Sequence, residues 1–312
     1  MKNTSSFIKS KRLAYLHQRN LDLARNHKRD IYVDNPEFLV YHWSGKAAAF
    51  SPATGETAAD VNERINLGDH NCRIDIGGPY PYVKQMPSKV SGFSYDPINF
   101  ATDYAFFLDH SPVIIHPSEL IVGEFYWQLD EARYFKYPQE NQDLGHKARH
   151  LGAGGMSLAH TCPDLSIGLK LGWNGLLDKI RYYKSKYQSY DNQKSYDYLC
   201  AAEQVCLAII RYVQRYAIEA EKLFEQETDP EQKALYKKVA DNCFNLAQKA
   251  PQTFVEALQW INFFQITERI IGHGNGYGRL DQLLIEFYRK DVQAGILTRD
   301  EAREYIAELY LK

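Results

Sequence analysis

One short stretch of the chain combines glycines with side chains that can bind a ligand or exchange a proton. It reads Gly272-His273-Gly274-Asn275-Gly276-Tyr277-Gly278-Arg279-Leu280-Asp281-Gln282, with glycine at every second position from 272 to 278. Glycine permits backbone angles closed to other residues, and it lets a ligand or a second backbone come close. A loop that also carries a histidine, an arginine and an aspartate is therefore a candidate site.

A structural interpretation of the same stretch stays open. In it the loop is a tight connection between two helices, and Arg279 and Asp281 cap a helix and fix the loop as a buried pair. The nucleotide-binding fingerprints do not apply, because no register gives G-x-G-x-x-G and no Lys-Ser or Lys-Thr follows as in a P-loop.

Two predicted helices hold this loop in position. Residues 251–271 are apolar on nearly every face, which is typical of a buried helix. After the loop, apolar residues recur with the i, i+3, i+4, i+7, i+8 spacing of a helix that has one face on a core: Leu280, Leu283, Leu284, Phe287 and Tyr288.

The rest of the chain is predicted to be mainly α with a minor β part. Periodicity predicts a basic, core-docked helix with solvated charges over residues 7–29, a helix opening at Pro163, and a long helix over 195–227. Residues 44–109 are rich in Gly, Pro, Ser and Thr and are expected to form long surface loops with short helical turns. The strand candidates are the short apolar runs Val113-Ile114-Ile115, Leu120-Ile121-Val122 and Phe125-Tyr126-Trp127.

Two helix starts are marked by capping patterns. Asp229-Pro230-Glu231-Gln232 places an N-cap aspartate before a proline at the first helical position. Thr298 with Glu301 forms a capping box for the last helix.

Composition limits the class of protein. The 312 residues suit one large domain or two ordinary ones, and the 45% hydrophobic and 24% charged fractions are those of a globular protein. A net charge of -2 gives no argument for nucleic acid or an anionic membrane as a partner.

Cysteine usage and the N-terminus bear on compartment. The five cysteines are an odd number with no C-x-x-C, which argues against a disulfide framework or a zinc ribbon and for a reducing, cytoplasmic location. The N-terminus lacks the apolar core of a signal peptide, and no run reaches the length of a membrane span. We therefore expect a cytoplasmic protein without bound metal.

Several segments together carry a resemblance to a known family. In chain order they are Ser118-Glu119-Leu120-Ile121-Val122-Gly123, His160-Thr161-Cys162-Pro163-Asp164, Leu169-Lys170-Leu171-Gly172-Trp173-Asn174-Gly175-Leu176, Thr253-Phe254-Val255-Glu256-Ala257-Leu258-Gln259, and Gly278-Arg279-Leu280-Asp281-Gln282 followed by Tyr288, Asp291, Gly295-Ile296 and Thr298. They resemble the motifs P-x-E-L-I-V-G, H-x-x-P-D, L-K-x-G-x-x-G, T-F-x-E-A-L-Q and G-R-x-D-Q of the pyruvate formate-lyase-like domain of glycyl radical enzymes. The likeness is clear over residues 111–312 and loose over 1–110.

The resemblance implies a fold and a reaction type. The fold would be the N-terminal portion of a ten-stranded α/β barrel wrapped in helices, with residues 1–312 as one partial domain. The reaction would be radical elimination or carbon–carbon cleavage on a small polar substrate by an anaerobic, dehydratase-like lyase. A fragment of a formate C-acetyltransferase and a non-catalytic helical scaffold or decayed paralogue are the alternatives.

The resemblance also assigns residues and partners. His160, His273 and Asp164 match positions that face the substrate, although Asp164 also suits a helix N-cap; Gly278, Arg279 and Asp281 are assigned to loop structure. The chain has no R-V-x-G-Y motif for the radical glycine and no cysteine in the central-loop context, so Cys162 is interpreted as structural. We therefore expect no activity from the chain alone, no directly bound cofactor, and as partners a missing C-terminal portion, a radical-SAM activating enzyme and a second subunit in a homodimer.

Overall fold

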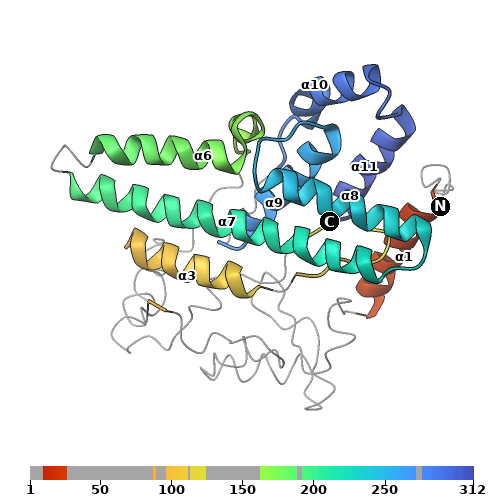
Figure 1. Cartoon of the computed structure of the whole chain (residues 1–312), viewed down its shortest axis with the longest axis horizontal. Helices are drawn as coiled ribbons and strands as arrows, with labels where there is room; N and C mark the ends of the chain where they lie inside the picture. The colour runs from red at the N-terminus through yellow and green to blue at the C-terminus, as the bar shows by residue number, and fades with distance from the viewer. Residues whose placement is uncertain are drawn as a thin grey trace, which may run out of the picture.

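The structure is a computed structural model, and it describes residues 10–26, 87–88, 96–111, 113–123, 162–187, 192–271 and 276–312. The helices in these ranges are α1 (Lys11–Asn26), α3 (Pro97–His110), α6 (Leu165–Tyr187), α7 (Gln193–Gln226), α8 (Pro230–Leu246), α9 (Phe254–Arg269), α10 (Leu280–Gln293) and α11 (Arg299–Leu311). α7 is the central element, and α3, α6 and α8 pack along it (Figure 1). α9 contacts α6, α8, α10 and α11, and α1 packs against α11.

α7 begins at an N-cap, Asn192, whose side chain accepts a hydrogen bond from the backbone N–H of Ser195. Its 34 residues span about 50 Å at 1.5 Å per residue. The long helix expected over 195–227 is thereby confirmed, and its buried residues run from Ala201 to Ala220. The middle of α7 therefore packs on its neighbours.

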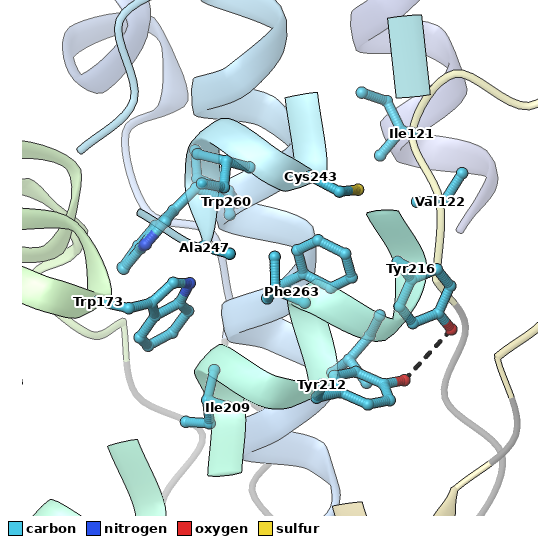
Figure 2. Packing of buried hydrophobic residues seen from close by; sticks show 14 of the residues in the cluster. Ile121, Val122, Trp173, Ile209, Tyr212, Tyr216, Cys243, Ala247, Trp260 and Phe263 are labelled. Atoms are coloured by element: carbon cyan, nitrogen blue, oxygen red, sulfur yellow. Dashed lines mark hydrogen bonds between the residues drawn. The ribbon is translucent and has the colours of Figure 1, made fainter. Parts of the chain in front are cut away.

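The core centres on α9, which is buried on nearly every side as its sequence predicts. Trp260 of α9 stacks on Trp173 of α6, with ring centroids 4.8 Å apart. On the other side Phe263 packs against the rings of Tyr212 and Tyr216, which also contact each other and whose hydroxyls are 3.3 Å apart (Figure 2). Large rings of this kind contribute much of the apolar area that holds the helices together.

Helix starts follow the capping patterns of the sequence. The Asp229 side chain accepts from the backbone N–H of Gln232, and Pro230 occupies the first turn of α8. Thr298 and Glu301 form the expected capping box of α11. Both predictions are confirmed, because caps depend on local sequence alone.

The prediction for residues 44–109 is wrong at its C-terminal end, where α3 is a buried helix of 14 residues. Asp96 caps it, accepting from the N–H of Ile98 at 2.9 Å. Asp103 is fully buried and accepts from the N–H and hydroxyl of Ser88 at 2.9 and 2.7 Å. The Asp96-Pro97 start and the apolar spacing that follows were the available signals for this helix.

The strand prediction at 113–123 is also wrong. None of the described residues lies in a strand, and this largely buried segment instead has a turn at residues 117–118 and bends at 120–121. The N–H groups of Leu120 and Ile121 donate to Oε1 of Glu308 at 2.6 and 2.9 Å. Gln259 accepts from the N–H of Val122 and donates to its carbonyl, both at 2.8 Å. Side chains of α9 and α11 therefore satisfy the backbone groups that a sheet would pair. Residues 125–127 lie outside the described residues.

Two kinds of interaction hold α1 against the rest of the molecule: ion pairs, and the burial of Leu13 and Leu16, which are both 3% exposed. Arg12 and Arg19, expected to be solvated, instead face inward and pair with Glu308 at 2.6 Å and Glu119 at 2.9 Å. Burial raises the pKa of the Glu308 carboxyl, while Arg12 and Lys312 act in the opposite direction. Buried charges are tolerated when each is paired with an opposite charge. This cluster pairs three cations with three carboxylates: Arg12, Arg19 and Lys312 with Glu119, Glu304 and Glu308.

The mainly helical prediction therefore holds for the described residues, and the ten-stranded barrel stays a prediction. Among the helices described, none has both the length and the apolar character needed to cross a membrane.

Candidate functional site

The structure brings together two segments that the sequence singled out separately. Residues 162–164 lead into α6, and residues 276–279 lead into α10. A methyl group built on Gly276 would lie 3.4 Å from Sγ of Cys162, and one built on Gly278 would lie 3.7 Å from its Cβ. The two segments therefore lie next to each other, separated by about the width of a methyl group.

The two candidate histidines stand close to this contact in sequence. His160 is two residues before Cys162, and His273 is three residues before Gly276. Both histidines lie outside the described residues, so their substrate role stays a prediction.

Of the loop glycines that the structure describes, Gly276 and Gly278, the second has a backbone conformation that favours glycine. Its φ is +67°, a left-handed value that residues with a Cβ adopt at a cost. The turn at Gly278 directs the chain into α10, whose first residue is Leu280. The glycine at position 278 thus has a conformational reason, whereas a Cβ at position 276 would make only an ordinary van der Waals contact with Cys162.

Tyr277 anchors the loop between these two glycines. Its ring meets the edge of Tyr310 of α11, with centroids 6.4 Å apart and planes at 74°. Burial raises the pKa of the Tyr277 hydroxyl. The sequence analysis missed this role, although an aromatic residue between two glycines was a usable signal.

Arg279 and Asp281 form the expected pair, in a two-pronged geometry. Nε and Nη2 of Arg279 donate to the two carboxylate oxygens of Asp281 at 2.9 and 2.8 Å. The prediction of a buried pair is wrong, because the two side chains are 70% and 65% exposed. The hydrogen bond from Arg279 lowers the pKa of the Asp281 carboxyl, so both side chains carry charge at the surface beside the loop.

Asp164 is exposed and is engaged with the start of α6. Its carboxylate accepts from the backbone N–H of Ser166 at 3.1 Å and from the Ser166 hydroxyl. This is the contact that a helix-capping aspartate makes. Both bonds reach the same carboxylate oxygen, Oδ1, and the substrate role of Asp164 stays a prediction.

α6 holds residues 162–164 in place through two glycines that allow close packing. A Cβ on Gly168 would lie 2.0 Å from Cη2 of Trp260, so the Trp260 ring of α9 occupies that space. Gly172 has φ 63° and ψ -179° and kinks α6; a Cβ there would lie 2.7 Å from the Ala250 backbone. Two residues later Asn174 donates to the carbonyl of Ala247 at 2.8 Å. The first turns of α6 are therefore fixed against α9 and the α8–α9 connection.

Cys162 is exposed and unbonded to other cysteines. Its packing against Gly276 and Gly278 supports the structural interpretation, although its exposure leaves the thiol accessible. In the described part of the chain no cluster of three or more His, Cys, Asp or Glu side chains is arranged to hold a metal ion. The chemistry available here is hydrogen bonding and charge from Asp164, Arg279 and Asp281 around a glycine loop.

Comparison with known proteins gives this geometry a context. Residues 126–312 match the pyruvate formate lyase-like family model. The chain is 32% identical over 167 residues to (2S)-3-sulfopropanediol dehydratase of Klebsiella oxytoca, covering 52% of this chain and 20% of the relative. This chain thus spans about a fifth of the length of that relative.

Solved structures share the fold. Hydroxyproline dehydratase from Clostridioides difficile superposes over 97% of this chain and 40% of its own length, with a TM-score of 0.67 and 19% identity. A glycyl radical enzyme from Archaeoglobus fulgidus superposes over 78% of this chain and 37% of its own, with a TM-score of 0.60 and 20% identity. The family match covers the α6 glycines, the buried α9 and the glycine loop alike, and the chain belongs to the pyruvate formate lyase-like family.

Proposed function

We propose that this chain is part of a glycyl radical lyase of the dehydratase type that acts on a small, polar, hydroxylated substrate. The observation that carries the proposal is the match of residues 126–312 to the pyruvate formate lyase-like family. Its relatives include a sulfopropanediol dehydratase and a trans-4-hydroxy-L-proline dehydratase, and both act on hydroxylated compounds by name. These relatives favour elimination over the acyl transfer of a formate acetyltransferase.

The proposed site lies where the segments following His160 and His273 meet. Contact between Cys162 and Gly276 supports it, because it joins the two segments that carry the histidines. A neutral imidazole can accept a hydrogen bond from a substrate hydroxyl, and an imidazolium can protonate that hydroxyl as it departs as water. Asp164, beside the same contact, would accept a hydrogen bond from a second polar group of the substrate.

The radical itself would be supplied from outside these residues. In a glycyl radical enzyme a backbone glycine radical, installed by a radical-SAM activating enzyme, starts the reaction by way of a cysteine. In this chain the residues of the proposed site would bind and orient the substrate and exclude water, since a radical must meet only its intended partner. A remaining catalytic portion and a homodimeric partner belong to the same proposal.

The first experiment is to determine the coding sequence that follows Lys312. The proposal expects an R-V-x-G-Y motif and a central-loop cysteine, either in frame or in a neighbouring gene whose product is expressed together with this chain. Finding neither would overturn the catalytic proposal in favour of a scaffold.

The second experiment assays the assembled enzyme after activation. Propane-1,2-diol and trans-4-hydroxy-L-proline are supplied anaerobically, and loss of water is measured as the carbonyl or imine product. His160→Ala and His273→Ala should each lower kcat about 100-fold or more, as loss of a general acid does. His110→Ala is the matched control, because His110 is exposed on α3. Equal rates in all three variants would refute the histidine roles.

A further inference from the structure

A cavity of about 660 Å³ lies between α3, α6 and α7, apart from the contact of Cys162 with the glycine loop. Its walls come from all three helices: Phe100 of α3, Trp173, Leu176 and Ile180 of α6, and Val205 and Ile209 of α7. Pockets of about 300–1,000 Å³ bury most of the surface of a small ligand. The cavity is therefore of a size that suits one small molecule.

The cavity has an apolar floor and an aromatic mouth. At the floor, Trp173 is 3% exposed and Cys206 is 5% exposed. Burial raises the pKa of the Cys206 thiol to about 11, which keeps the thiol uncharged at neutral pH. At the mouth, Tyr183 and Tyr198 are 41% and 65% exposed. A ligand would therefore place an apolar body on the floor and a polar end between the two tyrosines.

Charge at the mouth is positive. Among the described residues that line the cavity, Lys179 is the charged side chain, and none is an aspartate or glutamate. Glu203, on the neighbouring face of α7, is already bound by Arg181 at 2.7 Å and Lys184 at 2.6 Å. The mouth thus offers an ammonium group to an incoming anion, with no lining carboxylate from the described residues to compete.

We propose that this cavity binds a small amphiphile with an apolar body and a single anionic head group, of the class of medium-chain carboxylic acids. The body packs against Phe100, Trp173 and Ile209, which removes apolar surface from water. The carboxylate pairs with Lys179, the charged side chain among the described lining residues. The site is independent of the radical chemistry, because its lining contains no residue of the candidate active site.

The test uses the full chain, one fluorescent probe and two competing ligands. 1-Anilinonaphthalene-8-sulfonate joins an aromatic body to one anionic group, and its fluorescence rises in apolar surroundings. Decanoate and decylammonium share one tail and differ in the sign of the head group. One equivalent of the fluorescent probe should bind, decanoate should displace it, and decylammonium should displace it more weakly.

Two matched pairs of variants locate the site. Ala202→Phe fills the cavity that Ala202 lines, whereas Ala234→Phe places the same ring on the exposed surface of α8. Lys179→Glu reverses the charge at the mouth, whereas Lys170→Glu makes the same change on α6 outside the lining. Circular dichroism and melting temperature of each variant show whether it is folded.

The expected result is specific. Ala202→Phe abolishes one-to-one probe binding and Ala234→Phe does not. Lys179→Glu weakens decanoate about 2- to 5-fold, the range of an exposed ion pair, and strengthens decylammonium, while Lys170→Glu changes neither. If Ala202→Phe fails to fold, the proposal is tested by Lys179→Glu alone, through the change in its relative affinity for decanoate and decylammonium.

Three results would overturn the proposal. The first is equal displacement by decanoate and decylammonium in the unmodified chain. The second is probe binding unchanged in a folded Ala202→Phe variant. The third is probe binding that falls as the chain concentration rises and a dimer forms, which would assign the cavity to a second copy of the chain.

Discussion

Replacing Gly172 by alanine should test the close packing that fixes the start of α6. The backbone there has φ 63° and ψ -179°, in a region that is essentially restricted to glycine and costs other residues about 1–3 kcal/mol. The new Cβ would lie 2.7 Å from Cα and N of Ala250, which are backbone atoms and cannot rotate away. Overpacking of this kind costs about 1–3 kcal/mol. The two effects together predict a loss of about 2–6 kcal/mol.

Two other glycines separate these effects. Gly295 has φ +72° with nothing within 4 Å of an added Cβ, so Gly295→Ala reports backbone strain alone, about 1–2 kcal/mol. Gly168 has no positive φ, and its added Cβ would lie 2.0 Å from Trp260, so Gly168→Ala reports packing alone, about 1–3 kcal/mol. The free energy of unfolding of all three variants is measured by urea titration at pH 7.

The order of the three losses decides the argument. Gly172→Ala should lower the free energy of unfolding more than Gly295→Ala does. Both variants introduce backbone strain, and the Cβ added at position 172 also clashes with the backbone of Ala250. Equal losses at 172 and 295 would refute the close approach of α6 to the α8–α9 connection. A Gly168→Ala variant as stable as the unmodified chain would likewise refute the contact with Trp260.

Three further predictions address the clamp on residues 120–122, a helix cap and thiol reactivity. Gln259→Leu leaves the buried N–H of Val122 without its partner, while the Val122 carbonyl keeps the Asn262 side chain at 2.9 Å, and should cost about 1–3 kcal/mol in urea unfolding, with no loss disproving the clamp. Hydrogen bonds from Thr298 lower the pKa of Glu301 below its usual 4.5, so its stabilisation is present above pH 4.5 and lost as pH falls through the lowered pKa. Stability measured at pH 7 and pH 3 should therefore differ less in Glu301→Gln than in the unmodified chain. Iodoacetamide at pH 8 should modify exposed Cys162 well before Cys206, because a pKa of about 11 leaves only about a thousandth of the Cys206 thiol as thiolate. Mass spectrometry of the peptides measures the order of modification, and the reverse order would contradict the prediction.

Local sequence determined most of the helices. Cap residues such as Asp229 and Thr298 act within one turn, and the apolar repeat of α7 and α9 acts within one helix, so both could be recognised without tertiary information. The glycine loop was identified for the same reason, since its unusual feature is its own composition. α3 was not predicted, because residues 44–109 as a whole have the glycine- and proline-rich composition of loops, and the helix occupies only the end of that range.

Tertiary structure alone decided which segments meet and which charges are buried. The run from Leu120 to Val122 has strand-like composition, but side chains of Gln259 and Glu308 satisfy its backbone, and those partners are more than 130 positions away in sequence. The exposure of Arg279 and Asp281 and the inward position of Arg12 depend on how helices pack. The contact of Cys162 with Gly276 joins segments more than 100 positions apart. Sequence patterns record the preferences of one element, whereas such contacts follow from the packing of several.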